Sequence, residues 1–316
     1  FCIQFGCDWM AFLYASIAAI IGMRVRAKCN ESGLNHYMGI AISAFIATML
    51  AWASTLLPAE CTSTPWHPLL ACALFIVPGV PLINFVDDML DNYIQVGIVR
   101  AVNTLLMVSA MAFGIAFAVK LCSIGDFFPT ISMVPHHNYL EYAIAAAISA
   151  MGFSMIFNIQ RRLLWVVAIG GIIAVCTRNF VNLGPSTNNI GLDMGLVIGS
   201  FSGSVLVSLI AIKAVHWFHV PNHVLTIPSV IPMIPGVLMY RMLFGLINMN
   251  VQSIDQVTPL MKAIESGVNS GLVIMCIALG VAIPNIFGRK YIASSKNKRL
   301  AEILKERKAR GKFVEW

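Results

Sequence analysis

Runs of mostly apolar residues, each about 20 residues long, recur along the whole chain and limit its fold more than any other feature. A helix that crosses the ~30 Å hydrocarbon core of a bilayer needs about 20 such residues. The connections between the runs are short, and none has the size of a separate soluble domain. We predict nine spanning helices, at residues 9–23, 37–57, 69–85, 98–119, 140–157, 163–180, 190–212, 225–247 and 267–287.

The composition excludes a water-soluble globular domain. Of the 316 residues, 58% are hydrophobic and 11% are charged, whereas an average soluble domain has ~45–50% and ~25%. The net charge of +7 belongs to residues 288–316, which hold 10 Lys/Arg and 3 Asp/Glu (10 − 3 = +7), while residues 1–287 hold 11 of each. The basic charge therefore indicates membrane topology and does not predict a nucleic-acid partner.

Basic residues in the short loops predict the orientation, because positively charged loops stay on the cytoplasmic side. Residues 24–28, 161–162, 213 and 288–316 carry most of these charges and fall on one side when the spans are counted. We therefore expect a multi-pass protein of the inner (plasma) membrane with a cytoplasmic C-terminus. Residue 1 then lies outside, so a cytoplasmic start of the protein requires a tenth span before it.

Two similar segments indicate an internal repeat. Pro78-Gly79-Val80 and Pro235-Gly236-Val237 interrupt apolar runs 157 residues apart (235 − 78 = 157), and residues 5–13 resemble residues 157–165. With the tenth span, each half has five crossings, and an odd number inverts the second half. We predict an all-α integral membrane protein with two inverted repeats of about five helices each and Pro-Gly-broken helices at equivalent positions. The alternative is that Pro-Gly only ends two helices.

Three aspartates follow the first break. Asp87, Asp88 and Asp91 can share one helix face with Asn84, and Arg100, just inside the next span, is the natural counter-charge. Ionisable groups near a bilayer are costly and usually face a cavity, pair with each other or relay protons. We predict that these residues form the coupling and binding region, since crowded carboxylates bind protons more readily and can couple proton entry to solute movement. The alternative is a solvated amphipathic turn at the cytoplasmic surface.

The predicted site includes further residues around both breaks. Polar backbone that a break exposes at membrane depth must face protein or a water-filled cavity, and broken helices mark transporter sites. These residues are Pro78, Gly79, Asn103, Pro235, Gly236 and Tyr240. Arg178, with Asn179, Asn182 and residues 186–189, is predicted to contact a polar solute at the outer mouth, and a plain loop is the alternative.

The sequence carries no enzyme signature, because it has no Gly-rich phosphate loop, no Ser-His-Asp order and no HExxH motif. His216, His219 and His223 have a spacing that can collect a metal ion, but Pro221 interrupts that helix. The cysteines form no CxxC pair. We therefore expect no metal site, no cofactor and no enzymatic activity.

Several of these segments resemble the threonine/serine exporter (ThrE) family. The resemblance rests on Pro78-Gly79-Val80-Pro81-Leu82-Ile83-Asn84, on Asp87 and Asp88, and on Gly97 and Arg100. Phe5-Gly6-Cys7-Asp8-Trp9 is similar to the family's glycine-glycine-aspartate entry, with Cys7 in place of the second glycine. The chain also resembles the paired membrane proteins YjjP and YjjB fused into one. The resemblance implies ten spans, a cytoplasmic domain ahead of the first, and export of small amino acids driven by the proton motive force.

We divide the chain into a YjjP-like repeat at residues 1–122, a YjjB-like repeat at 123–287 and a basic cytoplasmic tail at 288–316, which suits a short helix on anionic headgroups. The expected function is a secondary exporter of threonine- or serine-like solutes, driven by protons. Its partners are the solute, protons and membrane lipids, and a homo-oligomer is left open. Export of a dicarboxylate such as succinate, a passive channel, and a membrane enzyme or assembly subunit are the alternatives.

Overall fold

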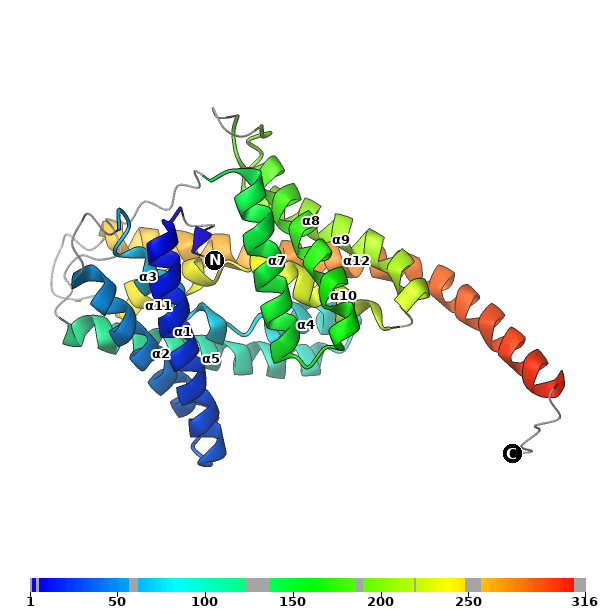
Figure 1. Cartoon of the computed structure of the whole chain (residues 1–316), viewed down its shortest axis with the longest axis horizontal. Coiled ribbons are helices and arrows are strands. Elements are labelled where there is room, and N and C mark those ends of the chain that lie inside the picture. The colour runs from blue at the N-terminus through cyan, green and yellow to red at the C-terminus, as the bar shows by residue number, and fades with distance from the viewer. Residues whose placement is uncertain are drawn as a thin grey trace.

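The computed structural model describes residues 2–3, 6–56, 62–122, 137–185, 190–218, 220–247 and 257–309. All regular secondary structure in these ranges is helical, which confirms the prediction of an all-α protein. The helices pack into one bundle, and the last helix extends well beyond it (Figure 1).

Seven helices of the described part are long and apolar enough to cross a membrane. They are α1 (Trp9–Glu31), α2 (His36–Trp52, prolonged by the 3₁₀ turn η2 at Ala53–Leu56), α5 (Ile94–Leu121), α7 (Tyr139–Ile156), α8 (Leu164–Asn182, preceded by η4 at Arg161–Leu163), α9 (Leu196–Phe218) and α12 (Val257–Ala309). Each overlaps one predicted span, so the spacing of the apolar runs predicted these helices correctly.

The two remaining predicted spans are pairs of shorter helices that meet at an angle. In the first, α3 (His67–Ala71) and η3 (Leu74–Ile76) meet α4 (Gly79–Leu90) with a bend of 56°. In the second, α10 (Asn222–Val230) and η5 (Ile231–Met233) meet α11 (Gly236–Ile247) with a bend of 62°. If each bent pair crosses the membrane once, the described helices make nine spans, the predicted number.

The bends have a local cause, because each occurs at a residue that precedes proline. A proline ring disfavours the α-helical region for the residue before it, and Val77 and Ile234 have ψ values of 122° and 130°. Pro78 itself has φ −78° and ψ 65°, and the Gly79 N–H donates to the Val77 carbonyl at 2.8 Å, which is an inverse γ-turn. The Gly236 N–H donates to the Ile234 carbonyl at 2.9 Å in the same way.

Helices before residue 122 and helices after residue 137, the two halves, make corresponding contacts. α1 packs on α2 and α2 on α5, while α8 packs on α9 and α9 on α12. α4 lies against α5 in the first half and α11 against α12 in the second, and the halves join where α4 meets α12 and α11 meets α5. The helices α4, α5, α11 and α12 therefore form a central contact between the halves.

Small residues let the helices approach closely, as is usual in membrane bundles. A Cβ at Gly114 in α5 would lie 2.2 Å from the Ala41 carbonyl oxygen in α2, and a Cβ at Gly203 in α9 would lie 2.6 Å from that of Ala174 in α8. Any side chain at these two glycines would collide with backbone, so the glycines set the distance between these helices.

The basic tail, for which the sequence predicts a short helix on anionic headgroups, is helical as far as Ala309. α12 runs without a break from its apolar part, Leu260–Gly288, to Ala309, so residues 289–309 project from the bundle as its continuation (Figure 1). Lys, Arg, Glu, Ala and Leu all favour helix, and no proline follows Pro284 in this stretch. Intrinsic helix propensity therefore explains the continuous helix.

Candidate functional site

The two helix breaks lie against each other in the core. A Cβ on Gly79, at the first break, would be 2.9 Å from Cδ1 of Ile234 and 3.2 Å from Cγ1 of Ile231, both at the second break. Both isoleucines are buried. A methyl group at position 79 would therefore require the side chains of Ile231 and Ile234 to shift.

The contact is reciprocal. A Cβ on Gly236 would be 2.8 Å from Cδ2 of Leu74 and 3.0 Å from Cγ2 of Val77. These two residues stand 157 positions before Ile231 and Ile234 (231 − 74 = 157; 234 − 77 = 157). The structure thus brings together the two predicted Pro-Gly segments, 78–79 and 235–236, through residues that are 157 positions apart.

The C-terminal end of α4 carries the predicted acidic cluster and folds back onto α5. Arg100 donates from Nη1 to Oδ2 of Asp88 at 2.5 Å, so the predicted counter-charge pairs with one member of the cluster. Asp91 ends α4, and its N–H donates to the carbonyl of Asp87. Gly97 permits the close approach of α5, because a Cβ there would lie 2.9 Å from the carbonyl oxygen of Phe85.

A histidine from the second half joins this cluster. Nε2 of His223, in the first turn of α10, lies 3.9 Å from Oδ2 of Asp87. Asn222 anchors that turn, because its Nδ2 donates to Oδ1 of Asn285 in α12. Sequence reasoning did not find the contact between His223 and Asp87, since the two residues are 136 positions apart (223 − 87 = 136) and lie in different halves.

The other predicted site residues make different contacts. The Tyr37 hydroxyl donates to Oδ1 of Asn103 at 2.6 Å, which joins α2 to α5. Arg178 is buried near the end of α8, where its guanidinium donates to Oδ1 of Asn179 at 3.1 and 3.3 Å. Asn84 is half-buried on α4. The side chain of Tyr240, residues 186–189 and His219 lie outside the described residues.

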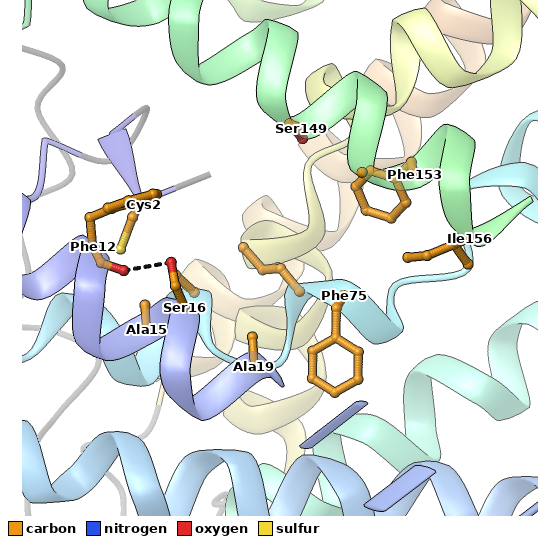
Figure 2. A pocket seen from close by; sticks show the side chains of 12 residues that line it. Cys2, Phe12, Ala15, Ser16, Ala19, Phe75, Ser149, Phe153 and Ile156 are labelled. Atoms are coloured by element: carbon orange, nitrogen blue, oxygen red, sulfur yellow. Dashed lines mark hydrogen bonds between the residues drawn. The ribbon is translucent and has the colours of Figure 1, made fainter. Parts of the chain in front are cut away.

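Two cavities lie beside the breaks. The first, of about 260 Å³, is bounded by α1, α7 and the segment from α3 to η3, and we call it the α1–α7 cavity. Figure 2 shows Phe75 of η3 and Phe153 of α7 in its wall, and Ser16, whose hydroxyl donates to the Phe12 carbonyl at 2.8 Å. The second, of about 220 Å³, lies between α4, α5, α11 and α12, and we call it the α4–α11 cavity. Both broken helices border this second cavity.

Asp8, in the segment before α1, ties the start of that helix to a neighbouring loop. Its carboxylate accepts hydrogen bonds from the N–H of Ala11 at 2.7 Å, the hydroxyl of Thr62 at 2.8 Å and the N–H of Ser63 at 2.7 Å. Partial burial raises the pKa of this carboxyl, but the hydrogen bonds outweigh burial and hold the pKa below its usual value. Asp8 is thus the N-cap of α1.

The fold and the site together define a class of protein: a multi-pass helical membrane protein in which two bent spans pack against each other. Bent and broken spans of this kind are typical of secondary transporters. Comparison with known families agrees, because residues 1–122 match a family described as a putative threonine/serine exporter, and residues 142–287 match one described as threonine/serine exporter, ThrE. The chain belongs to the threonine/serine exporter (ThrE) family, which confirms the resemblance found in its motifs.

One curated relative gives a second comparison. The chain is similar to the probable succinate transporter subunit YjjP of Klebsiella aerogenes, with 29% identity over 113 residues. The match covers 36% of this chain and 43% of the relative, so the chain spans less than half the length of that protein. No solved structure matches the chain. The family and the relative agree in transport and differ in the solute that their names give.

Proposed function

We propose that this chain forms the membrane body of a secondary active exporter that moves threonine and serine outward and is driven by the proton motive force. The observation that carries the proposal is the reciprocal packing of Gly79 and Gly236, each against the other helix break. The proposal also uses the charged cluster at the end of α4, where His223 of the second half lies 3.9 Å from Asp87 of the first.

Equivalent positions of the two breaks support an inverted repeat. α4 begins at Gly79 and α11 at Gly236, so the helices after the breaks start 157 positions apart (236 − 79 = 157). Counted along the nine spans, the bent pairs are the third and the eighth. An interval of five crossings makes them run through the membrane in opposite directions. Segments of equal conformation and opposite direction fit a two-fold axis in the membrane plane, on which alternating-access transporters are built.

Backbone hydrogen bonds support the same correspondence. The Leu82 N–H donates to the Pro78 carbonyl at 3.0 Å, and the Met239 N–H donates to the Pro235 carbonyl at 3.2 Å. Both bonds start the helix that follows a break. The two breaks are therefore alike in local structure as well as in spacing. Two unrelated helix ends would not need to share these hydrogen bonds.

Charge distinguishes the halves and provides a route for coupling. At the positions equivalent to Asp87 and Asp88 the second half has Phe244 and Gly245 (87 + 157 = 244; 88 + 157 = 245). At these positions only the first half carries acids. Protonation of Asp87 or Asp88 removes a charge that holds α4 to α10 or to α5. Proton binding would then shift the balance between states in which this end of the protein is closed or open.

The solute path is proposed to run between the breaks and this charged end. Broken helices offer backbone amides to a carboxylate and carbonyls to an ammonium group, which suits the two ends of a zwitterion. The proposed path comprises Pro78, Gly79, Asn84, Asp87, Asp88, Asp91, Arg100, Asn103, Pro235, Gly236, Tyr240 and, at the outer mouth, Arg178. We further propose an inner-membrane location, with the α4 end and residues 288–316 on the cytoplasmic side next to anionic lipids.

Export of a dicarboxylate is the second candidate. It is favoured by the similarity to YjjP, whose name gives succinate as the transported solute. A dianion needs compensation by cations, and Arg100 and the buried Arg178 are the guanidinium groups that would supply it.

Reconstituted protein decides between these candidates. Proteoliposomes are loaded with labelled threonine, serine or succinate, and efflux is measured with and without an imposed pH gradient. The proposal expects threonine and serine efflux that depends on the gradient and stops with an uncoupler. Efflux of succinate alone supports the second candidate, and efflux that ignores both the gradient and the uncoupler identifies a passive channel.

A further inference from the structure

The walls of the α4–α11 cavity that come from the broken helices are formed by corresponding residues. Leu82 and Phe85 line it from α4, and Met239 and Met242 line it from α11. Each pair is separated by the interval between the two breaks (239 − 82 = 157; 242 − 85 = 157). The residues that α4 and α11 contribute to the cavity therefore stand at the same distance along the chain from their respective breaks.

The residues of the other two walls also form pairs, at a different interval. Thr104 and Leu105 line the cavity from α5, and Ser270 and Gly271 line it from α12. These pairs share another constant interval (270 − 104 = 166; 271 − 105 = 166). Each half thus contributes one hydroxyl to a cavity that is otherwise mainly apolar.

The two hydroxyls are used differently. Thr104 donates to the carbonyl of Arg100 one turn earlier, at 2.7 Å, which is the common arrangement for Ser and Thr inside a helix. Ser270 is 3% exposed, and its Oγ has no hydrogen-bond partner among the described residues. A buried hydroxyl without a partner is unfavourable. Ser270, a residue that lines the cavity, therefore holds a buried hydroxyl without a partner in the described part of the chain.

The cavity opens toward the outer face of the bundle between α5 and α12. Leu105 is 55% exposed, and its counterpart Gly271 is exposed as well. Both belong to the apolar parts of their spans, Ile94–Leu121 and Leu260–Gly288, so this face meets the hydrocarbon of a bilayer. A molecule that is dissolved in the bilayer can enter here, whereas a charged solute from water cannot.

Gly271 keeps this opening free. A Cβ there would meet no atom of the described chain within 4 Å, although glycine weakens a helix relative to alanine. Gly267, one turn earlier, differs, because a Cβ there would lie 2.3 Å from the sulfur of Met242. A side chain at 267 would therefore have to displace the side chain of Met242, whereas a side chain at 271 would enter open space.

We propose that the α4–α11 cavity binds an uncharged amphipathic molecule from the bilayer, with a short apolar tail and one hydroxyl or carbonyl group that bonds to Ser270 Oγ. An apolar cavity of ~150 Å³ holds benzene, so this cavity of about 220 Å³ takes a tail of roughly six to eight carbons. The occupant wedges apart α4 and α11, the segments that follow the breaks. We expect the occupant to slow transport, and this consequence rests on the proposed function. The binding of the occupant does not depend on that function.

The test uses the full chain in lipid nanodiscs and an eight-carbon alcohol that carries a photoreactive diazirine. Adducts are located by mass spectrometry, with unlabelled 1-octanol as competitor. We expect saturable labelling of α4, α5, α11 or α12 at the cavity wall. Ser270→Ala should raise the concentration of 1-octanol that halves the labelling about 3- to 10-fold. Octane lacks the hydroxyl group, so in the wild type it should compete as weakly as 1-octanol does in Ser270→Ala. Gly271→Leu fills the mouth and abolishes the labelling.

Gly152→Leu is the matched control, because Gly152 lies in a spanning helix, lines the α1–α7 cavity and likewise leaves open space for a Cβ. It should leave the labelling unchanged. Thermal unfolding shows whether each variant is folded. If Gly271→Leu does not fold, the comparison between Ser270→Ala and wild type tests the proposal. Labelling that is unsaturable and spread over all lipid-facing helices, or saturable but equal in Ser270→Ala and wild type, overturns the proposal. The experiment measures binding and not transport. Failure of this proposal can therefore be distinguished from failure of the proposed transport function.

Discussion

Gly79 and Ile234 approach so closely that a Cβ on Gly79 would lie 2.9 Å from the terminal methyl carbon of the isoleucine. Gly236 and Val77 form the corresponding contact, at 3.0 Å. Each break therefore packs against side chains of the other. The side chains of Ile234 and Val77 thus fill the space that a side chain on either glycine would occupy.

Gly79→Ala should destabilise the bundle by about 1–3 kcal/mol, since it overpacks a buried contact, and should slow efflux. Ile234→Val removes Cδ1, the nearest atom, so the double variant should recover part of the lost stability. Thermal unfolding in detergent measures the cycle. Gly152→Ala, whose Cβ meets open space, is the control. Strictly additive effects of the two substitutions would show that this contact does not limit stability.

Asp88→Asn should uncouple efflux from the pH gradient while changing stability by less than about 1 kcal/mol. The small stability effect follows because the side chains of Arg100 and Asp88 are 36% and 23% exposed, and ion pairs of this exposure contribute little. Gradient-driven efflux and thermal unfolding are measured on the same preparation. Glu265→Gln, an exposed carboxylate on α12, is the control. Full gradient-dependent efflux by Asp88→Asn at normal expression removes Asp88 from the coupling mechanism.

His223→Gln should change the rate of efflux, because it removes the imidazole that lies 3.9 Å from the Asp87 carboxylate and joins α10 to the end of α4. His223→Lys keeps a nitrogen donor in this position and carries a positive charge, so it should hold α10 to α4 and slow efflux. Initial efflux rates at one pH compare the variants, and thermal unfolding shows that each is folded. Equal efflux rates for wild type, Gln and Lys would exclude this contact from the transport mechanism.

Asp8→Ala should destabilise the protein by about 1 kcal/mol at neutral pH, because it removes the N-cap of α1. The pKa of Asp8 is lower in the folded protein than in the unfolded chain. Its stabilisation is therefore fully present above the unfolded pKa and is lost as the pH falls through the folded value. Melting temperatures of both proteins at pH 7 and at acidic pH should converge on acidification. A constant difference would mean that the charge on Asp8 is not involved.

The spans and the positions of the bends were predictable because their causes are local. A hydrophobic run long enough to cross the bilayer is read from about 20 consecutive residues, and the bend at Val77 follows from the proline that comes next. The same local reasoning placed Arg100 near the aspartates, since only a short turn separates them. It also predicted a helix in the tail, where α12 continues without a break to Ala309.

The sequence by itself determined that this is an all-helical membrane protein with two similar interrupted spans, because bilayer thickness and proline geometry act on neighbouring residues. Only the tertiary structure decided that Gly79 packs on Ile231 and Ile234, that His223 reaches Asp87, and that Thr104 and Ser270 line one cavity. These contacts join residues more than 130 positions apart. They depend on which helix faces fit together, and the physical reason is that close packing is a property of the whole bundle and not of any single segment.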